Sequence, residues 1–206
     1  MKIITISREF GSGGRELGKR LADKAGIAYY DTEIITEIAK MTNLDPTYVS
    51  TISEKGVPSF NFHFGHSFGA TINQTAMDVV VAQQKVVKEI AKKGDCVIVG
   101  RCADKILKDY RPLRIFVYAD EDSKLKRCRE KNHEDDGLTD KQMLKKMKSI
   151  DNDRKKMYEF VAGCVWGDMK QYDLCLNTSG VNIKEIVDCV NVYADAWFAC
   201  KKHTSD

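Results

Sequence analysis

The residues best suited to chemistry in this 206-residue chain form a glycine cluster at positions 11–14, which Arg8 and Arg15 flank. A β-branched run at 3–7 precedes the cluster, and an amphipathic helical pattern at 15–25 follows it. Glycine allows consecutive backbone N–H groups to point at an anion beside the N-terminus of a helix. The cluster could also be a turn that needs glycine only for its backbone conformation. Four glycines within eight residues and two nearby arginines exceed that need, so we predict a phosphate-binding loop.

The cluster departs from the common phosphate-loop pattern, G-x-x-x-x-G-K-[ST]. In an ungapped comparison Arg8 stands at the first glycine, and Gly14 stands at the lysine. The cation that usually grips the phosphates is therefore missing from its place. Arg15 lies one position further along and has a longer side chain than lysine, so it is our candidate for a substitute cation.

Other arginines follow patterns that would bring them to the same place. Arg101 comes directly after a buried strand pattern at 96–99, and ligands collect at the carboxyl ends of parallel strands. We therefore expect Arg101 at the mouth of the cleft. Arg127 and Arg129 precede a break at 135–137, which predicts a helical hairpin over the cleft. A solvated helix face would explain Arg129 equally well.

Asp151 and Arg154 are three residues apart in a helical pattern, so they lie on one face of that helix. A local salt bridge is the simpler explanation of this pair in isolation. Together with the glycine cluster, however, the arginines form the set that phosphoryl transfer needs. Its catalysis is mainly positioning and cationic stabilisation, and arginine is permanently charged and bidentate toward phosphate.

Apolar strand patterns alternate with helical patterns, which predicts an α/β fold with a parallel sheet and helices on both faces. The expected strands are 3–7, 27–30, 96–99, 114–118 and 173–177, and the main expected helices are 15–25, 32–41, 70–93, 120–133, 139–161 and 183–198. Asp31 is the expected N-cap of the second helix. The aromatic stretch at 55–69 predicts a flap, in which His63 and His66 have surface or substrate-stacking roles rather than metal ligation.

Composition argues against several classes of protein. A net charge of +3 without long runs of one sign argues against a nucleic-acid surface. No segment approaches the roughly eighteen apolar residues of a membrane span, and no signal-peptide pattern precedes the first strand. The seven cysteines are widely spaced without a C-x-x-C motif. We therefore expect reduced thiols, with Cys96 and Cys175 in buried strands, in a cytoplasmic protein.

The order and spacing of these motifs resemble those of the cytidylate kinase-like family of P-loop kinases over almost the whole chain. The motifs that carry the resemblance are residues 3–18, Tyr29-Tyr30-Asp31, Val97 to Arg101, the Arg127 and Arg129 segment, Asp151 to Arg154, and the stretches 172–174 and 177–179. The resemblance implies one P-loop kinase domain over 1–206, with a five-stranded parallel sheet, an acceptor-binding insert at 43–75 and a lid hairpin at 124–154. It also implies ATP as phosphoryl donor, Mg²⁺, and a small-molecule nucleotide as substrate.

The resemblance further implies roles for individual residues. The phosphates of ATP would contact Gly11, Ser12, Gly13, Gly14, Arg15 and Glu16. Catalysis would involve Arg15, Arg101, Arg127 and Arg129, with Arg101 at the acceptor phosphate and Arg127 or Arg129 as a clamp on the transferring group. The acceptor would contact Asp31, Arg101, Asp151 and Arg154, the last two at the sugar and base of cytidine.

The chain departs from the family's G-x-x-G-x-G-K-G-T and G-R-D patterns at Gly14, Glu16 and Cys102. The lysine, the magnesium-binding hydroxyl and the aspartate are absent, so the sequence identifies no magnesium ligand. We expect a nucleotide kinase-like phosphotransferase that acts on CMP or a related pyrimidine nucleotide. The alternatives are a nucleotide-binding protein without turnover and a kinase for a non-nucleotide small molecule. A homodimer is compatible with the apolar last helix, which could equally face the core.

Overall fold

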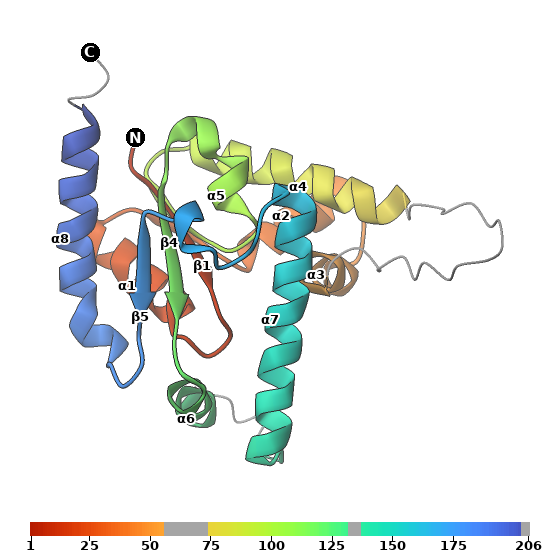
Figure 1. The fold of residues 1–206 in the computed structure, drawn as a ribbon. Coiled ribbons are helices and arrows are strands. Elements are labelled where there is room, and N and C mark those ends of the chain that lie inside the picture. The colour runs from red at the N-terminus through yellow and green to blue at the C-terminus, as the bar shows by residue number, and fades with distance from the viewer. Residues whose placement is uncertain (56–73, 132–136, 203–206) are drawn as a thin grey trace.

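A five-stranded parallel sheet in the order β2-β3-β1-β4-β5 lies at the centre of the fold (Figure 1). The computed structural model describes residues 1–55, 74–131 and 137–202. The strands are β1 (Ile3–Arg8), β2 (Ala28–Tyr30), β3 (Cys96–Val99), β4 (Leu113–Tyr118) and β5 (Leu174–Asn177). Ile6 on the central strand β1 pairs with Val99 on β3 and with Ile115 on β4. The loops after β1 and β3 therefore leave the sheet side by side at one edge.

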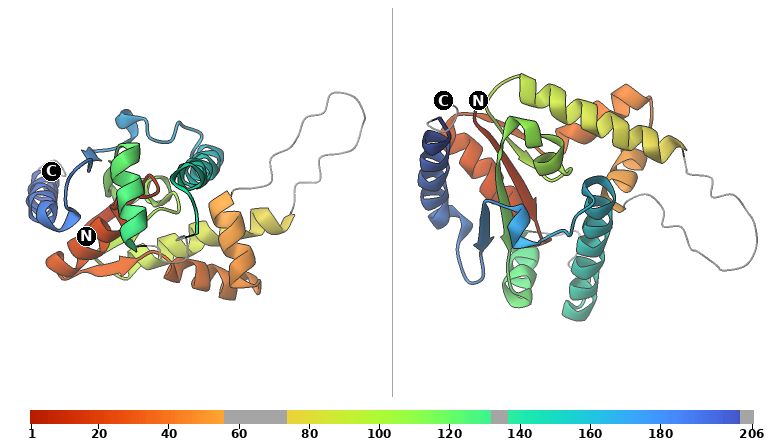
Figure 2. Two further views of the ribbon diagram at one scale, coloured as in Figure 1. Left: turned by 90° about the horizontal axis from the view of Figure 1, so that it is seen from below. Right: turned by 45° about the horizontal axis from the view of Figure 1, so that its top comes forward.

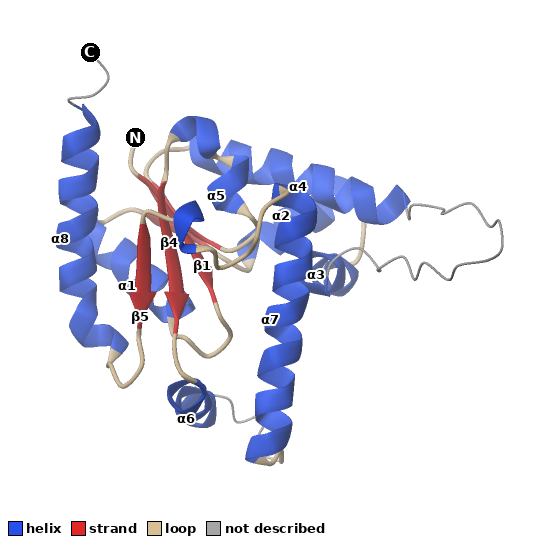
Figure 3. Ribbon diagram, in the orientation of Figure 1, coloured by secondary structure: helices blue, strands red, loops and turns tan. Residues whose placement is uncertain are grey.

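Helices connect the strands and cover the sheet on both faces (Figure 3). In the described ranges the α-helices are α1 (Gly14–Ala25), α2 (Glu33–Thr42), α3 (Pro46–Lys55), α4 (Gln74–Lys92), α5 (Ala103–Ile106), α6 (Glu121–Lys131), α7 (Asp140–Ala162) and α8 (Ile183–Lys202). Short 3₁₀ turns, η1 (Lys108–Tyr110) and η3 (Met169–Gln171), precede β4 and β5. None of these helices combines the length and apolar character needed to cross a bilayer.

Two hydrophobic cores separate because successive strand residues point to opposite faces of the sheet. Ile4 and Ile6 of β1 pack with Leu17 and Leu21 of α1 and with the apolar side of α8. Ile3 packs instead with α2, α4 and α5 on the other face. This arrangement fixes β1 between both layers and aims its last residue, Arg8, at the carboxyl edge of the sheet.

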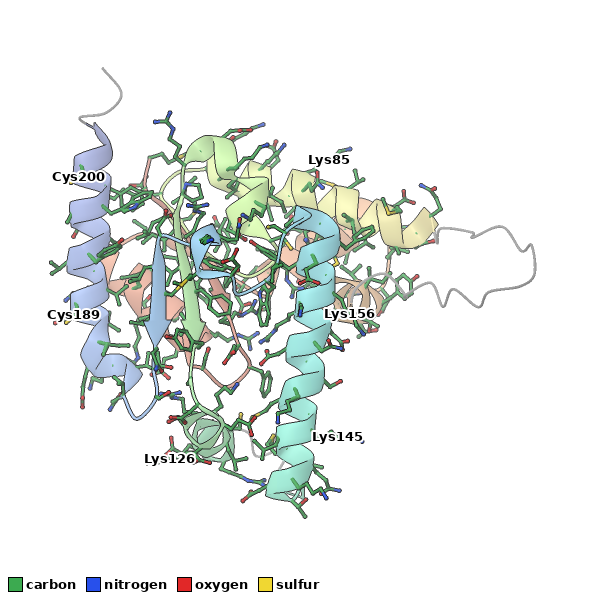
Figure 4. All side chains as sticks on the ribbon, in the orientation of Figure 1. Lys85, Lys126, Lys145, Lys156, Cys189 and Cys200 are labelled. Atoms are coloured by element: carbon green, nitrogen blue, oxygen red, sulfur yellow. The ribbon has the colours of Figure 1, made fainter. Side chains whose placement is uncertain are left out.

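Helix α6 lies at that carboxyl edge, below the end of β4 in Figure 1, and α7 runs beside the sheet down to the level of α6 (Figure 1 and Figure 2). A small third core of Cys128, Met143 and Met147 joins the two helices and contacts Phe10 in the loop after β1. The outer surfaces of the two helices carry exposed lysines, among them Lys126 and Lys145 (Figure 4). The hairpin formed by α6 and α7 is thus packed onto the loop after β1, residues 9–13, which we call the phosphate-loop segment. The role of the hairpin as a lid stays a prediction.

The predicted α/β fold is confirmed, but two local predictions are wrong. Thr32, not Asp31, occupies the N-cap of α2, and it makes no side-chain capping bond. Asp31 is instead buried and faces Arg15, because an ion pair satisfies a buried carboxylate better than one helix amide does. Cys175 is exposed rather than buried, since β5 is an edge strand of the sheet.

The predicted flap at 55–69, with His63 and His66, lies outside the described residues from position 56 onward. The predicted insert at 43–75 is described only where it contributes α3 and the beginning of α4. The insert and its contact with an acceptor therefore stay predictions.

Asp104 of α5 is buried in the core beneath the sheet edge, where the hydroxyl of Tyr158 donates a 2.6 Å hydrogen bond to its Oδ2. Burial raises the pKa of Asp104 above its ordinary value, although the Tyr158 bond and Lys105 act in the opposite direction. The folded state therefore holds this proton more tightly than the unfolded state does. Protonated Asp104 therefore stabilises the folded state at acid pH, and this stabilisation is lost as the pH rises above the unfolded pKa of the carboxyl group.

We predict that Asp104→Asn becomes more stable relative to the wild type as the pH rises from 4 to 7, because asparagine has no charge to bury. Urea unfolding at both pH values measures the difference in free energy of unfolding. Asp109→Asn, at an exposed position on η1, is the control. A stability difference for Asp104→Asn that is the same at both pH values would contradict the prediction.

Candidate functional site

A cleft of about 570 Å³ opens at the carboxyl end of β1, and this volume is typical of small-molecule sites. The predicted site residues in its wall are Gly11, Gly13, Gly14, Arg15, Glu16, Asp31, Arg127 and Arg154. Residues in the wall for which no role was predicted are Arg8, Glu9, Phe10, Lys19, Tyr29, Thr32 and Cys128. The cleft is therefore built around the phosphate-loop segment, as expected, but with additional charged residues.

The loop after β1 ends at Gly13, which caps α1 with a φ of 84°, a left-handed conformation that suits glycine. The hydrogen-bond ladder of α1 begins with Leu17 N, which donates to Gly13 O at 2.9 Å, and the amides of the first turn precede that bond. Such amides attract anions together with the helix dipole. Ser12 is buried, and its hydroxyl donates to Glu9 O at 2.8 Å. The loop can therefore offer backbone donors to a phosphate, while the Ser12 hydroxyl is used within the loop.

Arg8 places its guanidinium in the base of the cleft, with its side chain only 13% exposed. Two glycines leave room for it. A Cβ on Gly14 would lie 2.6 Å from Arg8 Cβ, and a Cβ on Gly100 would lie 2.0 Å from Arg8 Nη1. Burial and the charge of Arg154 lower the pKa of Arg8 to about 9, which leaves it protonated at neutral pH.

Sequence reasoning assigned no role to Arg8, because the loop pattern marks this position only as a missing glycine. The signal that could have found it is the combination of an arginine at the end of the strand with a glycine at the lysine position. Taken alone, Arg8 is the loss of a glycine and Gly14 is the loss of a lysine. In the structure the two residues pack against each other, so the two changes belong together.

Asp31 is the carboxylate that faces this positive charge. Its Oδ2 lies 2.5 Å from Arg15 Nε, and its Oδ1 lies 3.9 Å from Arg8 Nη2. The hydroxyl of Tyr29 donates to Oδ2 at 3.4 Å. Burial, reinforced by the charge of Asp31, raises the pKa of Tyr29, which therefore stays a neutral donor. Arg15 is 62% exposed, so its ion pair with Asp31 is open to competition from a ligand.

A second pocket, of about 50 Å³, lies beside the cleft at the carboxyl end of β3. Arg101 lines it, and its backbone oxygen accepts a 3.1 Å hydrogen bond from Gln83 Nε2. Ser53 Oγ and Gln83 Oε1 are buried there without a hydrogen bond to any described residue. Buried polar atoms of this kind usually meet water or a polar ligand. Arg8 and Arg154 line both this pocket and the larger cleft, so the two spaces adjoin.

Asp151 and Arg154 join α7 to the phosphate-loop segment. Arg154 Nη1 lies 3.1 Å from Asp151 Oδ1 and donates to the backbone oxygen of Arg8 at 3.3 Å. Asp151 also accepts a 2.7 Å bond from the amide of Phe10, and Arg154 lies over the Phe10 ring at 5.7 Å. Burial raises the pKa of Asp151, while the charge of Arg154 acts in the opposite direction. The predicted pair exists, and it positions Arg154 at the boundary of the two pockets.

Arg127 reaches the cleft wall from α6, but its guanidinium binds backbone oxygens. It donates to Gly11 O at 3.4 Å, to Val181 O at 2.9 Å, and to Thr178 O. The hydroxyl of Thr178 in turn donates to Ser12 O at 2.7 Å. Arg127 therefore ties the phosphate-loop segment to the loop between β5 and α8. A catalytic role for Arg127 stays a prediction.

Arg129 lies apart from the other predicted residues. Its Nη2 is 2.8 Å from Asp140 Oδ1, and it also donates to the backbone oxygen of Leu138. It lines a shallow depression between α6 and α7 rather than the cleft. Contact between Arg129 and a ligand in the cleft would require the hairpin to rearrange, so its predicted role needs a change that this structure does not contain.

Carboxylates near the loop are already paired with cations. Glu16 Oε1 accepts a 2.8 Å bond from Arg20, and Glu9 Oε2 accepts a 3.0 Å bond from Lys124. Among the described residues, no group of three or more histidines, cysteines, aspartates or glutamates is arranged to hold a metal ion. A metal in this cleft would therefore depend on ligand oxygens in addition to those of the protein.

Known proteins resemble this chain in sequence and in fold. A model of the cytidylate kinase-like family matches residues 3–180. A cytidylate kinase from Methanococcus vannielii is 29% identical over 181 residues, which are 86% of this chain and 90% of that protein.

Solved structures give the same fold. An uncharacterized protein from Eubacterium ventriosum superposes with a TM-score of 0.70 and 30% identity, over 95% of this chain and 99% of that one. A shikimate kinase from Bacteroides thetaiotaomicron gives a TM-score of 0.55 at 14% identity, over 94% and 98% of the two chains. At that identity the likeness shows the P-loop kinase fold alone.

We predict that Arg127→Met lowers the free energy of unfolding by about 1–3 kcal/mol, because it leaves backbone oxygens in two loops without a charged donor. Urea unfolding followed by circular dichroism measures the loss. Lys126→Met, at the exposed neighbouring position on α6, is the matched control and should change stability little. If both variants are equally stable, Arg127 does not hold the two loops together.

Proposed function

The chain belongs to the cytidylate kinase-like family, and we propose that it transfers the γ-phosphoryl group of ATP to CMP or a related pyrimidine nucleotide. The observation that carries the proposal is the pair of adjoining pockets at the carboxyl edge of the sheet, with Arg8 and Arg154 in both walls. Direct phosphoryl transfer requires a donor and an acceptor held side by side. The large cleft beside the helix N-terminus suits the donor, and the small polar pocket suits the acceptor phosphate.

The donor phosphates contact the backbone from Gly11 to Glu16 in this proposal. The N-terminus of α1 beside the cleft supports it through its dipole, as does the exposed cation of Arg15, which can turn from Asp31 toward a phosphate. On the acceptor side, Arg101 binds the monophosphate, and Asp151 holds Arg154 toward it.

The chemistry of the cleft fits ATP together with Mg²⁺. Magnesium usually takes one or two carboxylates and completes its octahedral shell with phosphate oxygens and water. Glu16 and Glu9 both line the cleft and supply such oxygens, whereas the Ser12 hydroxyl is bonded within the loop. When bound, the ion neutralises charge on the bridging phosphates. The substrate is a small molecule, consistent with a cleft of about 570 Å³ and a net charge of only +3.

A coupled assay of ADP release, with saturating MgATP and a panel of nucleoside monophosphates, tests the proposed function. We expect turnover with CMP or another pyrimidine monophosphate, and chromatography should identify the corresponding diphosphate as product. Adding non-nucleotide acceptors to the panel, such as small polyols and hydroxy acids, separates the alternative acceptor class. No turnover with any nucleotide at high enzyme concentration would contradict the proposed function.

A second candidate function is nucleotide binding without turnover. The observation that favours it is that both arginines predicted to clamp the transferring group are already bonded to protein atoms. Arg127 binds backbone oxygens, and Arg129 binds Asp140. Titration calorimetry distinguishes the two functions. Micromolar binding of ATP together with zero turnover supports a binding protein, whereas turnover excludes it.

We predict that Arg101→Met raises the KM for the nucleotide acceptor by about 10- to 100-fold and changes the KM for ATP by less than about threefold. Loss of a charged hydrogen bond is worth roughly 1.5–3 kcal/mol, and Arg101 lines the small pocket but not the large cleft. Initial rates with each substrate varied in turn measure the effect, and circular dichroism checks the fold. Equal increases in both KM values would contradict the assignment of the two pockets.

A further inference from the structure

We propose that Arg8, which lies outside the glycine cluster, is the cation that holds the phosphoryl group in transit, in the place of the missing loop lysine. This inference rests on the proposed function and adds to it a residue for which the sequence analysis assigned no role. Three independent observations support it: the space that Arg8 occupies, the charge that it carries, and its place between the two pockets.

The space around Arg8 leaves no room for a side chain at position 14. A Cβ on Gly14 would lie 2.6 Å from Arg8 Cβ and 3.1 Å from Arg8 Cγ. These are the first atoms of the arginine side chain, so they cannot swing away as a flexible tip could. Gly14 has no positive φ that would require glycine for its backbone. Arg8 is therefore the nearest obstacle to a side chain at 14, with Val117 Cβ next at 3.3 Å, and a lysine at 14 would have to displace Arg8.

The charge on Arg8 is only weakly compensated by the protein. Its side chain is 13% exposed, and no described residue accepts a hydrogen bond from its guanidinium. Its ion pair with Asp31 is long, at 3.9 Å, and the closer partner of that carboxylate is Arg15, at 2.5 Å. A buried cation in this state is stabilised by a bound anion, and the planar guanidinium suits phosphate oxygens.

Arg8 also lies where a transferring group must pass. It lines the large cleft and the small pocket, and its guanidinium rests against Gly100, at the end of β3, beside Arg101. Arg15 lines only the large cleft and is 62% exposed. Arg15 is therefore placed to meet the outer part of a donor, whereas Arg8 lies at the boundary that the phosphoryl group crosses.

Binding of inorganic tripolyphosphate, measured by titration calorimetry at fixed ionic strength, tests the charge on Arg8 without requiring turnover. We expect Arg8→Met to lose about tenfold or more in affinity and Arg8→Lys to stay within about threefold of the wild type. Methionine and lysine have similar unbranched side chains, so the comparison separates charge from space filling. Arg111→Met, at the opposite end of β4, is the control. Arg8→Met that binds within twofold of the wild type would overturn the proposal.

Thermal unfolding of single and double variants tests whether the side chain at position 8 excludes one at position 14. This test does not depend on how well Arg8→Met folds. Gly14→Lys should lower the Tm by several degrees in the wild-type background, because overpacking costs about 1–3 kcal/mol. In the Arg8→Gly background the same substitution should lower it much less. An equal Tm loss in both backgrounds would show that Arg8 does not exclude a side chain at 14.

The kinetic arm separates this proposal from the proposed function. If the wild type shows no turnover, the proposed function fails, while the tripolyphosphate result still decides the role of Arg8. If the wild type is active, we expect Arg8→Met to lower kcat by a larger factor than it raises the KM for ATP, because the contact forms with the group in transit. An active Arg8→Met variant with unchanged kcat would remove Arg8 from the transfer step.

Discussion

A concentration of arginine side chains at the carboxyl edge of the sheet is the constraint on which the rest of this site depends. The guanidinium groups of Arg8, Arg15, Arg101 and Arg154 converge there from four separate segments of the chain. Two buried or half-buried carboxylates, Asp31 and Asp151, each pair closely with one arginine. Burial, together with the repulsion from Arg154, lowers the pKa of Arg8, and a polyanion is the kind of ligand that relieves that repulsion.

The fold tolerates this concentration of charge because the sheet and its glycines fix each arginine separately. Arg8 is the last residue of the central strand β1, and it pairs with Val117 of β4. Gly14 and Gly100 leave the volume into which its side chain extends. Arg127 then joins the phosphate-loop segment to the loop after β5, which keeps the cleft wall in place from the opposite side. The glycine-rich loop is thus shaped by its neighbours as well as by phosphate binding.

Local patterns in the sequence predicted the fold well, since strand and helix periodicity are properties of short segments. The predicted helix at 139–161 and strand at 96–99 agree closely with α7 and β3. Side-chain partners were less predictable, because they join residues far apart in the chain. Asp31 is a good N-cap by residue type, yet its partner is Arg15, and nothing local indicates that Arg127 binds Val181 O. Arg8 was missed for a related reason: a motif comparison scores each position alone, whereas Arg8 and Gly14 have meaning only as a pair.

The central claim is that a donor and an acceptor nucleotide bind together in adjoining pockets across this arginine cluster. It is tested most directly by calorimetric titration with a bisubstrate compound in which adenosine and cytidine are joined through their 5′ carbons by five phosphates. The account predicts one molecule bound per chain, at least about 100-fold more tightly than ATP, because linking two ligands makes the second contact intramolecular. Affinity no greater than that of ATP, or two molecules bound per chain, would contradict it.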